Sequence, residues 1–169
     1  MVNNALIFQR LDILEQKQFL TNEKIDLILS AIEDKSIKPK QGIFYNGQMY
    51  DAYVFIATLI KSAKTEIILI DNYIDESVFT LLSKRDKDVK ATIYTQNITK
   101  ELELDLKKHN AQYPNIALKK FNQSHDRFLI LDQKEVYHIG ASLKDLGKKW
   151  FAFSKLAIEN LAILERLEK

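Results

Sequence analysis

Apolar residues in the first part of the chain recur at alternating steps of four and three. The repeat runs through Ile7, Leu11, Leu14, Gln18, Thr21, Ile25, Ile28 and Ile32. This spacing is typical of a heptad seam, and polar residues at its centre would fix the register between two paired helices. We therefore expect a helix from Asn3 to about Ser36, in an N-terminal segment 1–38 that dimerises as a coiled coil. A helix packed on its own domain shows a similar stripe, so that alternative stays open.

A strong turn signal follows the proline that should end this helix. Asn46-Gly47 stands between two short runs rich in aromatic residues, 42–45 and 48–50, a pattern typical of a β-hairpin. Residues 51–64 then carry apolar residues at helical spacing, and Asp51 is placed to cap that helix. We therefore expect a small hairpin followed by the first helix of a domain.

Short apolar runs alternate with amphipathic stretches over the rest of the chain. The runs at 66–71, 89–95, 116–121, 128–131 and 136–139 predict strands, and 75–85, 99–110 and 155–169 predict helices. Strands joined by single helices make right-handed crossovers. The expected fold class is α/β, with a mixed, mostly parallel sheet flanked by helices over residues 41–169 and the N-terminal helix in front.

Composition narrows the class of protein. The 169 residues, 46% of them hydrophobic, suffice for one domain with an appendage. A formal net charge of +2 means that any nucleic-acid site must be local. The sequence has no cysteine, which excludes thiolate catalysis and a cysteine zinc site and fits the cytoplasm. No signal-peptide pattern and no run of ~18–20 apolar residues is present, so we expect no membrane partner.

Candidate chemistry is concentrated at one predicted strand and the segment after it. His125 opens the strand, Arg127 lies two residues further on and on the same face, and Asp132 ends it. The segment 140–142, Gly-Ala-Ser, follows the next predicted strand.

This spacing resembles the HxKxxxxD signature of the phospholipase D superfamily, and residues 140–142 stand near that family's glycine-serine segment. Residues 67–95 are similar to its opening strand, helix and strand, so the resemblance covers roughly residues 41–154. It implies a phospholipase D-like fold and a metal-independent phosphodiesterase or nuclease without a cofactor. His125 would be the nucleophile or its acid partner, Arg127 would bind phosphate, and Asp132 would support the site. Because two motifs meet in this family, one motif per chain implies a homodimer.

Four further residues are candidates for binding phosphate or supporting the site. They are Ser142, Lys144, Asn72 and Tyr73. Ser142 belongs to the glycine-serine segment, and Lys144 supplies a nearby cation. Asn72 and Tyr73 follow the first predicted strand, at the edge where open parallel sheets place their ligands.

Two departures from the family pattern favour an alternative function. Arg127 replaces the usual lysine, which is not a conservative change where a compact ammonium is required. The asparagine that commonly follows the glycine-serine segment is also missing. The alternative is a catalytically inactive oligomerisation or ligand-sensing domain of a DNA-binding transcriptional regulator. Residues 71–75 and 138–155 are similar to the C-terminal region of RhuM-like or KilA-N-associated proteins of bacteria and phages, in which a DNA-binding domain often comes first.

A basic and aromatic cluster comes directly after the motif. It consists of Lys144, Lys148, Lys149, Trp150, Phe151 and Phe153, and residues 119–121 add Lys-Lys-Phe before the motif. Such mixtures can hold phosphates and stack bases, but the aromatic residues can equally belong to the core, with the lysines solvated. We expect Asp126 to face solvent or pair with a cation, and His109 and His138 to be structural.

Overall fold

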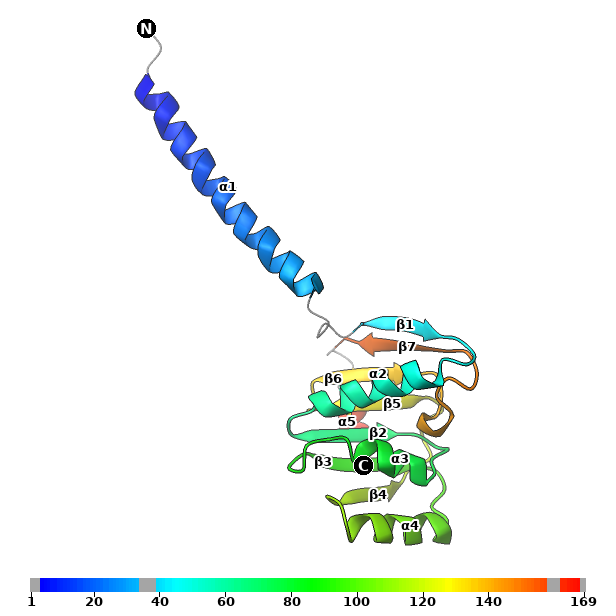
Figure 1. Ribbon diagram of the computed structural model, residues 1–169. Coiled ribbons are helices and arrows are strands. Elements are labelled where there is room, and N and C mark those ends of the chain that lie inside the picture. The colour runs from blue at the N-terminus through cyan, green and yellow to red at the C-terminus, as the bar shows by residue number, and fades with distance from the viewer. Residues whose placement is uncertain (1–3, 34–38, 158–161, 168–169) are drawn as a thin grey trace. The chain divides into compact units, whose positions relative to one another are not determined.

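The computed structural model describes residues 4–33, 39–157 and 162–167. The chain divides into two units, Met1–Pro39 and Lys40–Lys169. The first unit holds helix α1 (Asn4–Glu33), and the second holds the sheet and its helices (Figure 1). No helix among the described residues combines the length and the apolar composition needed to cross a membrane.

Helix α1 confirms the predicted N-terminal helix. On its seam, Ile7, Leu11, Leu14 and Ile25 are 46–60% exposed. Five more large apolar side chains are exposed off the seam, namely Leu6, Phe8, Ile13, Phe19 and Leu20. The predicted end of the helix at residues 34–36 and the side chains of Ile28 and Ile32 lie outside the described part. The helix therefore offers a long apolar surface.

One sheet of seven strands forms the body of the second unit, counted over the described residues. Its order is β1 (Gln41–Phe44), β7 (Phe151–Leu156), β6 (Glu135–Ile139), β5 (Arg127–Leu131), β2 (Glu66–Ile70), β3 (Lys90–Thr95) and β4 (Ile116–Lys120). Strands β2, β3 and β4 are parallel, as their helical connections predict. The other four pairings of the described strands are antiparallel. The mixed α/β sheet is confirmed, but the expected parallel majority is corrected, because loops and a tight turn rather than helices connect β4, β5 and β6.

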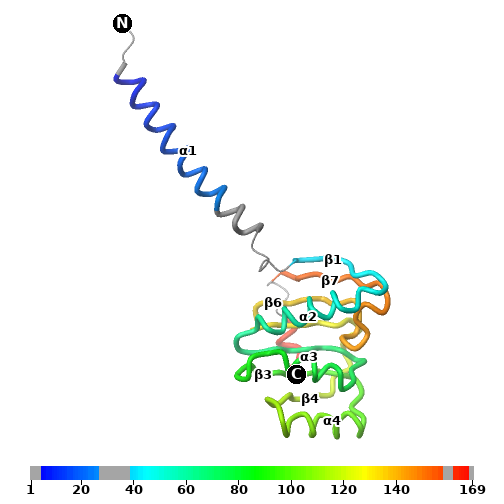
Figure 2. The backbone as a smooth tube through the Cα atoms, viewed as in Figure 1, coloured from blue at the N-terminus to red at the C-terminus, as the bar shows by residue number. Residues whose placement is uncertain are grey.

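The predicted hairpin at Asn46-Gly47 is wrong, although the turn itself is present. Gln48 donates its backbone N–H to the carbonyl of Tyr45 at 3.1 Å, and Gly47 has a φ of 89°, which favours glycine. The chain then enters α2 (Met49–Ser62) instead of a second strand, and Asp51 lies in the first turn while Gln48 takes the N-cap position. Strand β1 pairs with the distant β7, beside which it runs in Figure 2.

The two faces of the sheet bury different clusters. On one face, α2, α3 (Glu76–Leu82) and α4 (Lys100–Asn110) pack residues such as Ile56 and Phe79 against Leu69 and Leu129. On the other face, the short helix α5 (Ala162–Leu167) packs Leu164 and its neighbours against Ile68, Ile130 and Val136. The alternation of buried residues along β2 and β5 explains this arrangement, because successive side chains of a strand point to opposite faces.

The C-terminal prediction is corrected in part. Residues 155–169 were expected as one helix, but β7 extends to Leu156 and α5 covers only Ala162–Leu167 of the described residues. Phe151 and Phe153 alternate with exposed Ala152 along β7, which is the period of a half-buried strand. The predicted helices at 75–85 and 99–110 are confirmed as α3 and α4. Asp75 caps α3 by accepting the Ser77 N–H at 3.0 Å, and Thr99 caps α4 by accepting that of Leu102.

Candidate functional site

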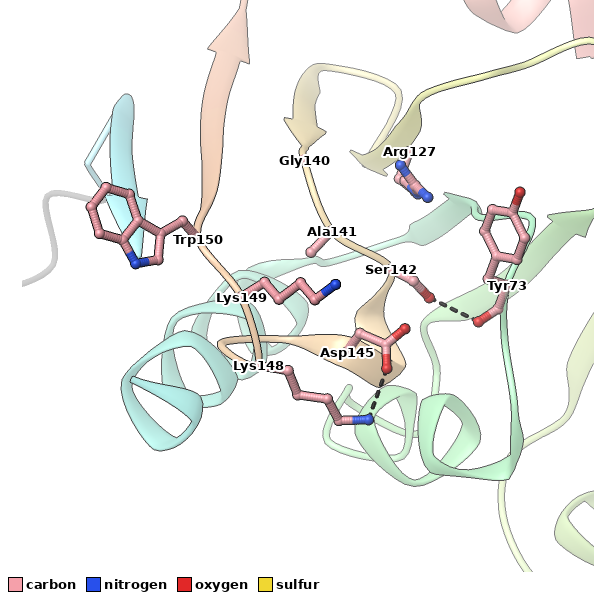
Figure 3. A pocket seen from close by; sticks show the side chains of 9 residues that line it. All are labelled: Tyr73, Arg127, Gly140, Ala141, Ser142, Asp145, Lys148, Lys149 and Trp150. Carbon is pink, nitrogen blue, oxygen red and sulfur yellow. Dashed lines mark hydrogen bonds and ion pairs between the residues drawn. The ribbon is translucent and has the colours of Figure 1, made fainter. Parts of the chain in front are cut away.

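A pocket of about 410 Å³ lies where β2 ends, β5 begins and the chain passes from β6 toward β7. Its lining consists of Tyr73, Arg127, Gly140, Ala141, Ser142, Asp145, Lys148, Lys149 and Trp150 (Figure 3). These elements meet because β5 is antiparallel to both β2 and β6, which pairs Ile70 with Phe128 and Arg127 with Ile139. Antiparallel pairing thus gathers residues that are distant in sequence at one end of the sheet.

Arg127 is the principal cation of this pocket. It is half-buried at the first position of β5, and its Nε atom is buried without a hydrogen-bond partner among the described residues. The guanidinium carbon lies 5.4 Å from the centroid of the Tyr73 ring, within the range of a cation–π contact. The guanidinium forms no ion pair with a described residue, so its terminal N–H groups can bind an anion in the pocket.

Asp71 supports the wall of the pocket from the protein interior. This residue is fully buried at the end of β2, and its carboxylate accepts hydrogen bonds from the Tyr73 N–H at 3.0 Å and the Leu143 N–H at 2.9 Å. Burial raises the pKa of Asp71, while these hydrogen bonds and the charge of Arg127 oppose that shift. The carboxylate therefore ties the end of β2 to the segment after β6 and faces the cation from inside. The sequence showed Asp71 only as the last residue of a predicted strand.

Ser142 lines the pocket but directs its hydroxyl inward. Its Oγ lies 2.9 Å from Oδ2 of Asp71 and 2.8 Å from the carbonyl oxygen of Tyr73. The residue is only 4% exposed, so its hydroxyl is engaged in holding the wall together. We conclude that Ser142 positions the segment after β6.

The segment before β7 supplies the remaining cations. Lys148 forms an ion pair with Asp145 at 2.8 Å, whereas Lys149 is exposed and forms no ion pair with any described residue. In Figure 3 the amine of Lys149 extends toward Ser142. Lys149 therefore adds an uncompensated charge to that of Arg127.

Gly147 fixes the path of this segment. Its φ of 70° is unfavourable for other residues, and a Cβ atom there would lie 2.6 Å from the backbone of Met49. Its carbonyl accepts a hydrogen bond from the Gly47 N–H at 3.0 Å. The turn at Asn46-Gly47 thus anchors the segment that carries Lys149 and Trp150.

His125 lies beside the pocket region and is not part of the lining. It is exposed on a bend before β5, so strand alternation does not orient its side chain as we expected. Asn72 holds this bend by donating its Nδ2–H to the carbonyl of Ser124 at 2.7 Å. Asp126 lies 3.8 Å from Nε2 of His138, in agreement with the predicted ion-pair role. The imidazole of His125 has no hydrogen-bond partner among the described residues and is free to meet a ligand.

Asp132 lies at the opposite end of β5 from Arg127. Its carboxylate accepts hydrogen bonds from the N–H groups of Lys64, Thr65 and Glu66 at 2.7–3.1 Å and from the Thr65 hydroxyl at 2.9 Å. These donors outweigh desolvation and lower the pKa of Asp132 to about 2. Its φ of 53° places it in the turn to β6. The structure therefore does not bring Asp132 to the pocket.

Two more candidates line a neighbouring pocket. Asn72 and Lys144 contribute to a cavity of about 370 Å³ that also contains Asp75 and Glu101, and neither lines the Arg127 pocket. Of the residues chosen from the sequence, the structure brings together Arg127, Ser142 and Tyr73. The lining also includes Gly140 of the glycine-serine segment and residues 148–150 of the basic and aromatic cluster, whereas Asp145 was missed because the sequence carried no distinct signal for it.

The basic and aromatic cluster divides between core and surface. Phe151 and Phe153 are buried, whereas Trp150 is 69% exposed. Lys119 lies 5.4 Å from the centroid of the Tyr94 ring. His109 is held structurally, since its Nε2 lies 2.7 Å from the Ser83 hydroxyl. No group of three or more metal-ligating side chains gathers in the described parts of the chain.

Solved structures share this arrangement. NucT from Helicobacter pylori matches 76% of this chain and 92% of its own, with 12% identity and a TM-score of 0.54. Nuc from Salmonella typhimurium, a phospholipase D family member, matches 76% and 91%, with 16% identity and a TM-score of 0.55. The archaeal chromatin protein TrmBL2 matches 97% and 63% with 19% identity, at a TM-score of 0.49 that is too low for an argument.

No protein-family model and no curated protein sequence matches the chain. The structural matches nevertheless agree with the resemblance found at the motif. Residues of the second unit therefore adopt a phospholipase D-like fold.

Proposed function

We propose that this domain binds phosphodiester groups, with the phosphate held at Arg127. The observation that carries the proposal is the half-buried guanidinium of Arg127, which forms no ion pair with a described residue, in a pocket that also receives the free amine of Lys149. A guanidinium presents a planar fork that matches two phosphate oxygens, and the low polarity around it strengthens the attraction. The overall charge of +2 is small, so this pair of cations supplies the local attraction.

The same pocket supports hydrolysis if two copies of the chain cooperate. In this proposal a ring nitrogen of His125 attacks phosphorus, the bond from phosphorus to one ester oxygen breaks, and the partner's His125 donates a proton to that oxygen. The partner's His125 then takes a proton from water as the water oxygen attacks the phosphohistidine, which releases the phosphate monoester and restores both imidazoles. Arg127 stabilises the charge on the other phosphate oxygens in both steps, so the mechanism needs no metal. Two observations support it: the free imidazole of His125 stands two residues before Arg127, and β5 begins at the pocket.

Helix α1 would provide the dimer that this mechanism requires. Its seam residues are exposed along the helix, and Arg10 and Glu15 lie at positions that pair across a parallel two-stranded coil. Burying the exposed seam residues Ile7, Leu11, Leu14 and Ile25 against a second copy would stabilise the dimer. A twofold arrangement would place two identical motifs opposite each other.

The alternative is a ligand-sensing or oligomerisation domain that binds the anion without cutting it. Arginine in place of lysine favours this function, because a guanidinium grips phosphate well and does not exchange protons near neutral pH. Both proposals share the phosphate site and the dimer, and they differ only in whether His125 attacks.

The deciding experiment measures hydrolysis of a chromogenic phosphodiester in excess chelator by wild type and His125→Ala, with the native mass of each sample determined in parallel. Because His125 is exposed and has no described partner, the variant should fold normally. Gln123→Ala, at an exposed position of the same segment that does not line the pocket, is the control. Chelator-resistant turnover by dimers that is lost only in His125→Ala supports the enzyme. Phosphodiester binding without turnover supports the sensing domain, and turnover by His125→Ala rules out the proposed nucleophile.

A further inference from the structure

Trp150 is an unusual feature of the pocket rim. It is 69% exposed, although the next residue, Phe151, is 5% exposed and belongs to the core. Indole surface is normally buried, because removing it from water is favourable. An exposed tryptophan beside two cations therefore indicates a surface that a ligand covers.

The indole is held in place by its surroundings. Tyr45 contacts it edge to face, with ring centroids 4.8 Å apart and planes at 87°. Despite this contact the residue is 69% exposed, so ring surface stays open to a ligand. The backbone just before it is fixed by Gly147, whose carbonyl accepts the Gly47 N–H. The open ring surface is thus preorganised, which lowers the entropy cost of binding a flat partner.

The open ring and the phosphate site share one cavity. Trp150 and Arg127 both line the pocket of about 410 Å³, and in Figure 3 Lys149 extends toward Ser142 while the indole of Trp150 lies on the opposite side of the segment that carries both residues. This size suits a small polar ligand rather than a duplex. The ligand that fits must combine a phosphate with a flat aromatic group.

We infer that the pocket holds one unpaired nucleotide of a single-stranded nucleic acid, with its phosphate at Arg127 and its base stacked on Trp150. The inference rests on the proposed phosphate site. Bases inside a duplex have both faces covered, whereas an unpaired base can stack on an aromatic side chain whatever its identity. Binding should therefore depend on strandedness more than on sequence.

A membrane phospholipid is the competing source of a phosphate, with Trp150 at the lipid interface. The pocket lining does not favour it, since four of its nine residues are charged, namely Arg127, Asp145, Lys148 and Lys149. Vesicles of phosphatidylglycerol are therefore included in the test as a competitor.

Trp150 is the only tryptophan of the 169 residues, so its fluorescence reports on this position alone. Full-length protein is titrated with a fluorescein-labelled oligothymidylate, followed by anisotropy, and with the unlabelled strand, followed by Trp150 emission. The same titrations use an abasic strand of equal length, a duplex and thymidine monophosphate. We expect quenching by the base-bearing strand only, and binding about tenfold weaker for the abasic strand and the duplex.

Variants separate the base site from the phosphate site. Trp150→Leu should weaken the base-bearing strand about tenfold and leave the abasic strand unchanged, and Trp150→Phe should restore most of the affinity. Tyr113→Leu removes an exposed aromatic ring that does not line the pocket and is the matched control. Arg127→Gln should weaken both strands.

The outcomes distinguish a failure of the base site at Trp150 from a failure of the phosphate site at Arg127. Equal, Arg127-dependent binding of normal and abasic strands without quenching would overturn the base site and retain the phosphate site. Absence of binding to every strand would overturn both. Monophosphate binding as tight as the strand, or vesicles that displace the strand and shift the emission of Trp150 to the blue, would replace the single strand by a free nucleotide or a lipid.

Discussion

The two ends of β5 carry polar residues of the same sequence motif, but the hydrogen bonding of these residues differs. At the start of the strand, Arg127 has a buried nitrogen without a partner and faces a pocket. At the other end, the carboxylate of Asp132 receives hydrogen bonds from three backbone N–H groups and a hydroxyl. Extended chain separates the two by roughly 16 Å.

The contrast separates a residue with hydrogen-bonding groups left free from a residue whose hydrogen bonds are used within the fold. A polar group whose hydrogen bonds are all made within the protein contributes to stability and has little left for a ligand. A polar group without a hydrogen-bond partner lowers the free energy of unfolding. A ligand that supplies the partner raises it again. Spacing in a motif therefore does not show which of its members touch the ligand.

The largest effect should come from removing the satisfied carboxylate. Asp132→Ala leaves four donors without an acceptor and puts alanine at a positive φ, so we expect a loss of about 3 kcal/mol in the free energy of unfolding. Urea denaturation measures it. Asp132→Asn keeps the turn, since asparagine tolerates this φ, and should lose about half as much. Unchanged stability of both variants would contradict the structural role. Under conditions in which the variants are fully folded, their affinity for a phosphodiester should equal that of the wild type.

Replacing Arg127 should instead lower the affinity for a phosphodiester and leave the free energy of unfolding almost unchanged. Arg127→Gln should weaken phosphodiester binding about 30-fold, because a charge-assisted contact is lost, and should change the unfolding free energy by less than about 1 kcal/mol. Calorimetric titration with a phosphodiester measures the affinity. Arg127→Lys keeps the charge but not the fork and should lie between the two. A strong loss of stability with unchanged affinity would reverse the assignment.

Lowering the pH tests whether the charge of Asp132 stabilises the protein, because this carboxyl has a lowered pKa. Because the folded pKa of about 2 is below the ordinary value of 3.8, this group stabilises the protein above pH ~4, and that contribution disappears as the pH falls toward 2. The raised pKa of buried Asp71 acts with the opposite sign. We therefore expect the difference in unfolding free energy between wild type and Asp132→Asn to shrink between pH 5 and pH 2.5. A constant difference would show that the charge of Asp132 is not what stabilises the turn.

The smallest effect concerns two exposed lysines near opposite ends of β5. Lys149→Ala should weaken phosphodiester binding about threefold, since an exposed charge is screened by water and salt, whereas Lys134→Ala should have no effect because it lies in the turn beside Asp132. The salt dependence of the affinity provides the check, and a lower slope only for Lys149→Ala is expected. Equal effects of the two variants would mean that overall charge, not the pocket, attracts the ligand.

Local signals allowed most elements to be predicted from the sequence. Apolar runs identified β2 to β6, and the capping residues Asp75 and Thr99 marked the starts of α3 and α4, because these interactions join residues within a few positions. The motif pointed to Arg127, and its neighbourhood to Ser142 and Tyr73, which do share a pocket. The role of Asp71 was missed, since its three hydrogen-bond donors come partly from residues about seventy positions away.

The sequence by itself determined the α/β class, the N-terminal helix and the position of the motif from His125 to Asp132, because periodicity and spacing are properties of neighbouring residues. Only the tertiary structure decided that β1 pairs with β7 instead of forming a hairpin at Asn46-Gly47, and that Trp150 is exposed while Phe151 is buried. It also decided that Asp132 binds the backbone of residues 64–66 far from the pocket. These outcomes depend on hydrogen bonds and packing between segments up to about a hundred residues apart, and the energy of such contacts is set only when the sheet assembles.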